Sequence, residues 1–258
     1  MSASIGLIGG TGLGELPEAA RASWECILTP YGDAFVQRFA AGGRDLIFLP
    51  RHGPDHATPP HMIRYRANVW ALHDLGARCI LASNAVGSLR EDLQPGRFVL
   101  PDQLVDFTKR RLDTFVTGEE GRPTHIDLTQ PFCASLRAQV LAAGHELELD
   151  VHDGGIYLCA EGPRFETAAE ICMFRAWGAD LVGMTAYPEA ALARELGLCY
   201  ASVCVVTNLA AGMTASPVSH AEVEAEMARQ GERLRELLLA AAQALPEDRT
   251  CACSQSAP

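Results

Sequence analysis

Short apolar runs alternate with amphipathic segments along most of the chain. Runs of strand length occupy 5–9, 24–28, 46–50, 79–83, 97–100, 103–106, 155–159, 180–183 and 198–206. Apolar positions recur at helical spacing in 64–75, 131–143, 168–177, 188–195 and 219–241. This alternation predicts an α/β fold.

The chain shows no internal repeat and no change of composition that would mark a second domain. We therefore predict one domain over residues 1–246, followed by a flexible polar tail over 247–258. The segment 109–127 is polar and is interrupted by Gly118, Gly121 and Pro123. It is expected to be a long loop that covers a site or reaches a neighbouring subunit.

Several predicted strands end in small, hydroxyl, amide or basic residues, and ligands of α/β proteins bind at such strand ends. These residues are Thr11, Arg51, His52, Asn84, Ala85, Met184, Thr185, Thr207 and Asn208. The glycine-rich turn around Thr11, the Arg51-His52 pair and Thr185 can together donate hydrogen bonds to a tetrahedral anion. They predict an anion site.

The segment 159–167, Cys-Ala-Glu-Gly-Pro-Arg-Phe-Glu-Thr, lies between a predicted strand and a predicted helix. Its Gly162-Pro163 step indicates a turn. The ring of Phe165 can stack on a planar base, and the Glu166 carboxylate can accept a hydrogen bond from a ring N–H. Together with Asn208, they predict a site for a planar heterocycle.

The formal net charge of -11 disfavours binding to nucleic acid or to an anionic membrane. No apolar run approaches the roughly 20 residues of a membrane span, and the first residues lack the features of a signal peptide. Seven of the nine cysteines lie scattered in apolar segments, as expected for reduced thiols of a cytoplasmic protein.

Two groups of residues raise the question of a metal, and neither pattern is complete. His52, His56 and His61 are separated by prolines, and no cysteine or carboxylate pattern completes the set. Cys251 and Cys253 could form a redox or metal pair, but no His or Cys lies near them in the sequence. We predict no metal, and a mobile tail with reactive thiols.

Six motifs, in this order, resemble the purine nucleoside phosphorylase / methylthioadenosine phosphorylase family, closest to its trimeric methylthioadenosine-phosphorylase-like branch. The resemblance runs from about Ile5 to Ala242. The motifs are Gly9-Gly-Thr-Gly, Arg51-His-Gly-x-x-His-x-x-Pro-Pro, Asn84-Ala-Val-Gly-Ser-Leu-Arg, Glu161-Gly-Pro-Arg-Phe-Glu-Thr, Met173-Phe-Arg-x-Trp-Gly-Ala-Asp and Met184-Thr.

The resemblance implies one α/β domain with a twisted mixed sheet flanked by helices, usually assembled as a homotrimer. It implies phosphorolysis of a purine nucleoside, with orthophosphate as co-substrate and neither metal nor organic cofactor. By motif match, the phosphate site comprises Thr11, Arg51, His52, Asn84, Ala85 and Thr185. Met184 falls under the ribose and Phe165 near the base, and the expected catalytic residues are Asn208, Glu166 and His52.

The chain departs from the adenine-specific pattern at the base. Adenine-specific members of the resembling family carry a Thr-Asp-x-Asp motif after the last strand, where this chain has Asn208 and Ala210. They carry Ser after the Phe of the Gly-Pro-Arg-Phe motif, where this chain has Glu166. A 6-oxopurine carries N1–H, which can donate to Glu166, whereas adenine N1 is an acceptor and would face that carboxylate repulsively. Mispaired buried groups cost about 1–3 kcal/mol each. Hypoxanthine or guanine is the predicted base.

At the 5′ position, methylthio-specific relatives carry an apolar residue where this chain has His220, which can bond a 5′-hydroxyl. His220 favours inosine or guanosine, although a helix-start residue facing water is the alternative, and S-methyl-5′-thioinosine stays open as a substrate. His125 and Phe132 are candidates to reach a neighbouring subunit's 5′ pocket.

Three other functions compete with this prediction. Methylthioadenosine phosphorolysis would keep the family and change the base. A nicotinamide-dependent oxidoreductase would rest on the first glycine turn alone, but Gly10-x-Gly12-x-Gly14 is one residue short of the dinucleotide motif and Pro17 interrupts the helix that should follow. A non-catalytic nucleoside-binding protein would have no need of the anion-binding residues.

Overall fold

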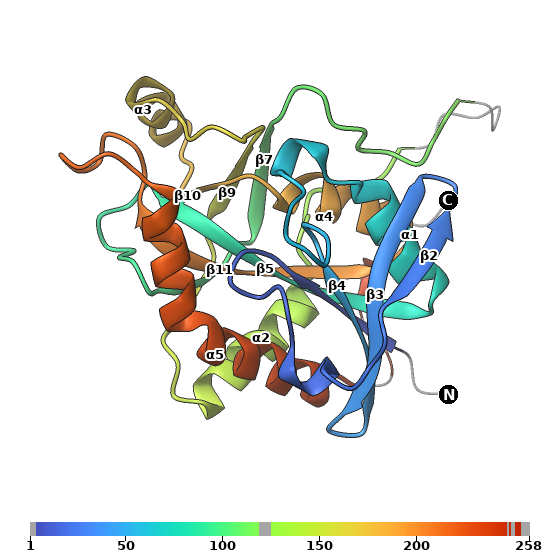
Figure 1. Cartoon of the computed structure of the whole chain (residues 1–258). Coiled ribbons are helices and arrows are strands. Elements are labelled where there is room, and N and C mark those ends of the chain that lie inside the picture. The colour runs from blue at the N-terminus through green and yellow to red at the C-terminus, as the bar shows by residue number, and fades with distance from the viewer. Residues whose placement is uncertain (1–3, 119–124, 247, 249–250, 254–258) are drawn as a thin grey trace.

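The computed structural model describes residues 4–118, 125–246, 248 and 251–253. Its strands are β1 (Ser4–Gly9), β2 (Glu25–Thr29), β3 (Gly32–Ala41), β4 (Arg44–Pro50), β5 (Ala77–Ser88), β6 (Phe98–Leu100), β7 (Gln103–Phe107), β8 (Val151–Asp153), β9 (Ile156–Ala160), β10 (Leu181–Gly183) and β11 (Cys199–Leu209). Its α-helices are α1 (Tyr65–Asp74), α2 (Ala134–Glu146), α3 (Ala168–Ala176), α4 (Ala186–Glu195) and α5 (His220–Ala244), shown in Figure 1. Pro17–Ala19 and Pro60–Met62 form short 3-10 helices.

The strands form one mixed sheet centred on β5. Its main path runs β2-β3-β4-β1-β5-β10-β9-β7, and β11 pairs with β5 and leads to β6 and β8. Strands β1 and β11 are parallel to β5, whereas β10 pairs antiparallel with its last residues. The sheet therefore divides at the carboxyl end of β5, and the prediction of a single α/β domain with a mixed sheet is confirmed.

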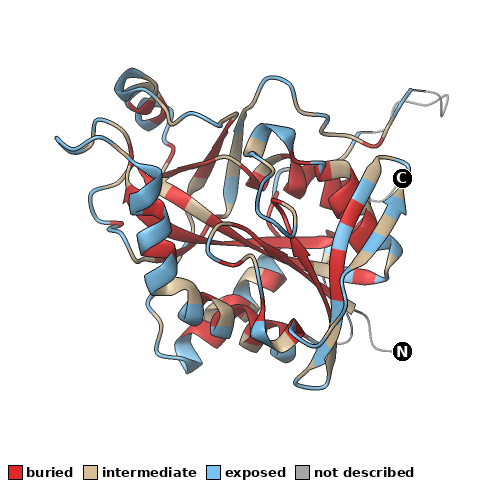
Figure 2. Cartoon of the chain, in the orientation of Figure 1, coloured by how far each residue is buried: buried red, intermediate tan, exposed pale blue. Residues whose placement is uncertain are grey.

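Helices cover both faces of the sheet, and the strands between them consist mostly of buried residues (Figures 1 and 2). Leu46 and Phe48 of β4 belong to the core cluster that includes residues of α2 and α5, whereas Ile47 and Leu49 belong to the cluster that includes residues of α1 and α4. Successive residues of a strand point to opposite faces. The apolar run 46–50 is thus a strand buried on both sides.

Two strands continue past the polar residues at which the sequence analysis ended them. Asn84 and Ala85 lie inside β5, and Thr207 and Asn208 lie inside β11. The strands continue because Asn84 finds a partner in the neighbouring strand, where its Nδ2 donates to Ser202 Oγ over 2.6 Å. The sequence analysis also missed β3 and β8, because neither contains the continuous apolar run by which the other strands were recognised.

The glycine turn after β1 leads to the short 3-10 helix Pro17–Ala19 and the strands β2 and β3, not to a crossover α-helix. A dinucleotide-binding unit needs that α-helix so that its N-terminus meets the pyrophosphate. The oxidoreductase alternative therefore has no structural support. Among the described residues, no helix is long and apolar enough to cross a membrane.

The structure contradicts two predictions, one about Phe132 and one about the cysteines of the predicted tail. Phe132 was a candidate to reach a neighbouring subunit, but it is buried in this chain's own core against Tyr200. In the predicted tail, Cys253 is buried within the core cluster that includes residues of α2 and α5, and Cys251 packs against it. The thiols at these two positions are therefore not those of an exposed tail, while residues 247, 249–250 and 254–258 lie outside the described part.

Candidate active site

A cavity of about 420 Å³ opens at the carboxyl ends of β5, β10 and β11. All predicted site residues line it except Asn84. We call one wall the anion side, formed by Thr11, Arg51, His52, Ala85 and Thr185. We call the other wall the base side, formed by Phe165, Glu166, Asn208 and Ala210; Met184 and His220 complete the predicted set.

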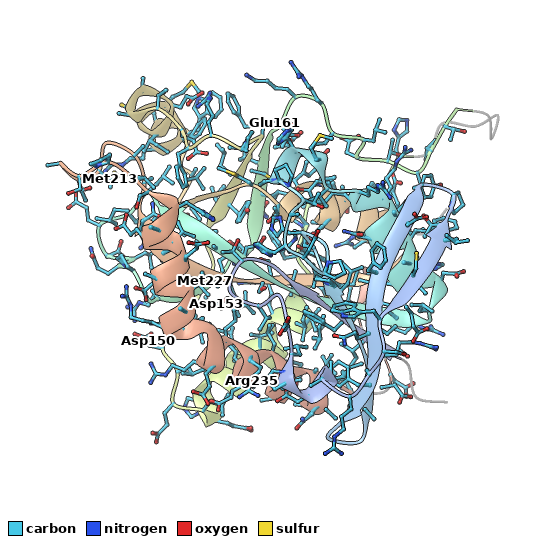
Figure 3. The ribbon with its side chains drawn as sticks, viewed as in Figure 1. Asp150, Asp153, Glu161, Met213, Met227 and Arg235 are labelled. Atoms are coloured by element: carbon cyan, nitrogen blue, oxygen red, sulfur yellow. The ribbon has the colours of Figure 1, made fainter. Side chains whose placement is uncertain are left out.

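The glycine turn reaches the cavity through Thr11, and helix α5 holds it in place. A Cβ on Gly10 would lie 2.6 Å from Arg51 Nη1, and one on Gly12 would lie 2.6 Å from Cβ of Met227 on α5. Figure 3 shows Met227 on this helix, together with Arg235, which pairs with Glu18. The glycines thus allow close packing, and the Gly10 N–H is already donated to Ser83 Oγ over 3.0 Å.

Arg51 lies in the wall of the cavity but is bound to the protein on three sides. Its Nε and Nη2 donate to the two carboxylate oxygens of Glu189 over 2.5 and 3.0 Å, and its Nη1 donates to the carbonyl oxygen of Ser83. Glu189 also accepts from the Tyr200 hydroxyl over 2.8 Å. Both members of the ion pair are almost fully buried, so the charge of Arg51 is balanced within the protein.

The sequence analysis gave Glu189 only the role of an acidic residue near a helix start. Glu189 does lie in the first turn of α4, but its side chain is buried against a strand end more than a hundred residues earlier. Nothing in the local sequence signals this pairing. Only the fold brings α4 and the end of β4 together.

His52 is held as a neutral ring with a defined orientation. Its Nδ1 lies 2.8 Å from the carbonyl oxygen of Thr58, so Nδ1 carries the proton and Nε2 is an acceptor. Burial, and then the charge of Arg51, lower the pKa of His52 to about 4. In this state His52 accepts a hydrogen bond from a protonated group instead of donating to an anion.

Thr185 and Asn84 form a buried chain of hydrogen bonds behind the cavity. The Thr185 hydroxyl donates to Asn84 Oδ1 over 2.5 Å, and Asn84 in turn donates to Ser202 Oγ. Asn84 is therefore a positioning residue in this structure: it does not line the cavity, but it fixes the side chain of Thr185, which does.

Glu166 lines the base side, and one oxygen of its carboxylate is buried without a partner among the described residues. Its Oε1 is inaccessible to solvent and receives no hydrogen bond from any described group. Burial, as the largest cause, raises the pKa of Glu166. Because an ionised oxygen that is removed from water needs a donor, Glu166 is poised to accept a hydrogen bond from a ligand next to Phe165.

Asn208 has its amide orientation fixed from both ends. Its Oδ1 accepts from the Thr207 hydroxyl over 2.9 Å, and its Nδ2 donates to the carbonyl oxygen of Leu209 over 2.9 Å. The amide keeps a second hydrogen on Nδ2 and a second lone pair on Oδ1. Thr207, which lines the cavity too, was noted at a strand end but given no role, and it acts here by orienting Asn208.

His220 lies at the mouth of the cavity. It is the first residue of α5, its side chain is 65% exposed, and its Nε2 lies 3.3 Å from a carboxylate oxygen of Glu224. His56, whose ring lies 4.7 Å from that of His52, also lines the cavity. Among the described residues, these histidines form no group of three potential metal ligands.

The chain is similar to known proteins over nearly its whole length. The phosphorylase superfamily profile matches residues 4–243. The chain is 45% identical to the 6-oxopurine nucleoside phosphorylase of Pyrococcus furiosus, over 98% of this chain and 97% of that one. It is 44% identical to a probable S-methyl-5′-thioinosine phosphorylase of Methanothermobacter thermautotrophicus, over 98% of this chain and 88% of that one.

The structure resembles that of methylthioadenosine phosphorylase from Schistosoma mansoni in complex with adenine. The two have a TM-score of 0.88 and 34% sequence identity, covering 93% of this chain and 91% of that one. The fold, the order of the motifs and the relatives lead to the same assignment: the chain belongs to the phosphorylase superfamily.

Proposed function

We propose that the protein catalyses the phosphorolysis of 6-oxopurine nucleosides, which converts orthophosphate and a nucleoside into the free base and a ribose 1-phosphate or 5-methylthioribose 1-phosphate. Superfamily membership and relatives named as nucleoside phosphorylases support the reaction type. The choice of base rests on one observation, the buried and unpartnered oxygen of Glu166.

The base side fits a 6-oxopurine better than adenine. A purine stacked on Phe165 can donate its N1–H to Glu166 Oε1, which supplies the missing partner and favours the ionised carboxylate. Adenine N1 is an acceptor, so it would leave Glu166 unpaired unless the carboxyl group took up a proton. Leaving such a group unpaired costs about 1–3 kcal/mol, and sites built for a donor reject ligands that lack it.

Asn208 is proposed to assist the departing base. Its second Nδ2 hydrogen can donate to O6, and its Oδ1 can accept from a protonated N7. Because Thr207 and the Leu209 carbonyl hold the amide in place, little reorganisation is needed as negative charge develops on the purine. Preorganised donors of this kind stabilise a transition state more than a ground state.

On the anion side, phosphate is proposed to lie among Thr11, Arg51, His52, Ala85 and Thr185. Arg51 carries N–H groups beyond those bound to Glu189 and Ser83. The His52 Nε2 acceptor fits a protonated phosphate oxygen. The glycosidic bond then breaks toward an oxocarbenium-like state that the phosphate charge stabilises, so the reaction requires no covalent intermediate on the protein and no cofactor.

The 5′ substituent of the substrate would lie near His220, at the mouth of the cavity. His220 can bond a 5′-hydroxyl, which favours inosine or guanosine, but it is largely exposed and already lies beside Glu224. S-methyl-5′-thioinosine therefore stays within the proposed substrate class, and the name of one relative supports it.

We further propose a homotrimer in the cytoplasm. The trimer rests on the resemblance of the motifs to the trimeric branch. The location rests on buried thiols such as Cys159 and Cys204, which suit a reducing compartment.

The direct test is turnover of inosine, guanosine, S-methyl-5′-thioinosine, adenosine and S-methyl-5′-thioadenosine, with and without orthophosphate. We expect phosphate-dependent release of base from the three 6-oxopurine nucleosides, at least about tenfold faster in kcat/KM than from the adenine nucleosides. Faster turnover of S-methyl-5′-thioadenosine would overturn the choice of base. Base release that does not depend on phosphate would overturn the reaction type.

A further inference from the structure

Four cysteines that are distant in sequence meet at one place outside the cavity. Cys133 precedes α2, Cys199 is the first residue of β11, and Cys251 and Cys253 follow α5. Their sulfur atoms all lie within 4.8 Å of one another. None of the four is among the residues that line the cavity, so the cluster is separate from the proposed active site.

This convergence differs from how other cysteines of the chain are buried. Cys159 and Cys204 are also fully buried, but the thiol of Cys159 donates to the Tyr187 carbonyl oxygen and that of Cys204 lies beside Ser202 Oγ. A buried cysteine packs well singly as a small apolar residue. Packing alone therefore gives no reason for four of them to gather.

The geometry suits a tetrahedral metal ion. Four thiolates at the usual zinc–sulfur distance have sulfur atoms about 3.8 Å apart, which lies within the limit that all the pairs satisfy. Cys199 Sγ and Cys251 Sγ are 3.2 Å apart, whereas a disulfide bond is about 2.05 Å long. The four sulfur atoms therefore form one group in which all are close enough to share a ligand.

The surroundings can accommodate the negative charge of thiolates. Cys133 stands at the N-terminus of α2, where the helix dipole favours an anion. Three of the four cysteines are almost fully buried, so water has little access to the cluster.

We propose that Cys133, Cys199, Cys251 and Cys253 bind one zinc ion in a closed tetrathiolate site that fastens the segment after α5 to the starts of α2 and β11. Binding releases the four thiol protons and involves no change of oxidation state. All four positions are filled by protein, so the site is structural and leaves no place for a substrate. The proposal does not depend on the proposed function.

The test uses the full chain, purified anaerobically with reductant and without chelator, and supplied with zinc. We expect one zinc per chain by elemental analysis. Cobalt in place of zinc should give the intense visible absorption of tetrahedral thiolate coordination. A chelator should lower the thermal unfolding midpoint of the wild type.

The variants Cys251→Ser and Cys253→Ser change residues that follow α5, and Cys251 is the less buried of the two. Each should lower zinc affinity about tenfold or more and abolish the chelator effect on thermal unfolding. Cys26→Ser and Cys172→Ser, at exposed positions, are matched controls and should keep one zinc per chain.

Three results would overturn the proposal. The first is wild-type protein that binds no zinc under these conditions. The second is equal zinc content in the wild type and in Cys251→Ser. The third is a peptide map in which the four cysteines are joined as disulfides in protein that was kept reduced.

Discussion

On the anion side of the cavity, Arg51 is already bound to Glu189 and Ser83, and Thr185 to Asn84. On the base side, Glu166 keeps a buried oxygen for which no described group is a donor. The protein thus already binds these two side chains of the anion side, whereas on the base side it leaves one buried oxygen without a partner. We therefore expect substitutions that break the bonds of the anion side to lower the stability of the fold as well as phosphate binding, and substitutions on the base side mainly to affect the choice of substrate.

The largest effect is expected when the buried ion pair is broken. Glu189→Gln leaves the Arg51 charge uncompensated in the core, which should lower the free energy of unfolding by about 3–5 kcal/mol. Urea denaturation at neutral pH measures this loss.

The chain provides a matched control in the pair of Arg38 with Glu25. Its two hydrogen bonds have the same bidentate arrangement, each 2.9 Å long, but the pair lies at the surface. Glu25→Gln should cost no more than about 1 kcal/mol. Equal losses from Glu189→Gln and Glu25→Gln would contradict the view that the anion side supports the fold.

His52 gives the next effect, which depends on pH. Its pKa in the folded protein, about 4, lies below the ordinary value of 6.5, so between these values the unfolded chain binds a proton that the folded protein excludes. The resulting stability is complete above about pH 6.5 and is lost as the pH falls toward 4. The loss amounts to about 3 kcal/mol.

The variant His52→Gln removes this titration. Urea denaturation at several pH values should show a shallower loss of stability below pH 6.5 than in the wild type. The exposed His61→Gln is the control and should keep the wild-type slope. An unchanged slope in His52→Gln would show that the ring is not held neutral by the fold.

The smallest effect is expected at the mouth of the cavity. His220 is 65% exposed, so a hydrogen bond from it to a 5′-hydroxyl competes with water. His220→Leu should lower the ratio of kcat/KM for inosine to that for S-methyl-5′-thioinosine by about fivefold at most, without changing the urea midpoint. A ratio that rises would show that His220 does not favour the hydroxyl.

Local sequence patterns were sufficient to predict the site residues that lie near the ends of strands. The fold class followed from apolar runs that end in polar side chains, together with the family motifs. The same patterns gave a set of site residues that all line the cavity except Asn84. The position of Asn84 did not follow, because a polar residue inside a strand is recognised only once its partner, Ser202, is in place.

Partners that only the fold brings together were also missed. Glu189 has no local signal for its pairing with Arg51, since the two are joined by the packing of α4 against the end of β4. Cys251 and Cys253 were judged to lack partners for the same reason, because Cys133 and Cys199 lie far away along the chain.

The most direct test of the contrast between the two sides is the variant Glu166→Gln, compared with the wild type on inosine and adenosine. The amide lacks the carboxylate charge and can donate to adenine N1. The ratio of kcat/KM for inosine to that for adenosine should therefore fall about 10- to 100-fold, while the urea midpoint stays the same or rises. An unchanged ratio, or a large loss of stability, would contradict the assignment of Glu166 as the residue that selects the base.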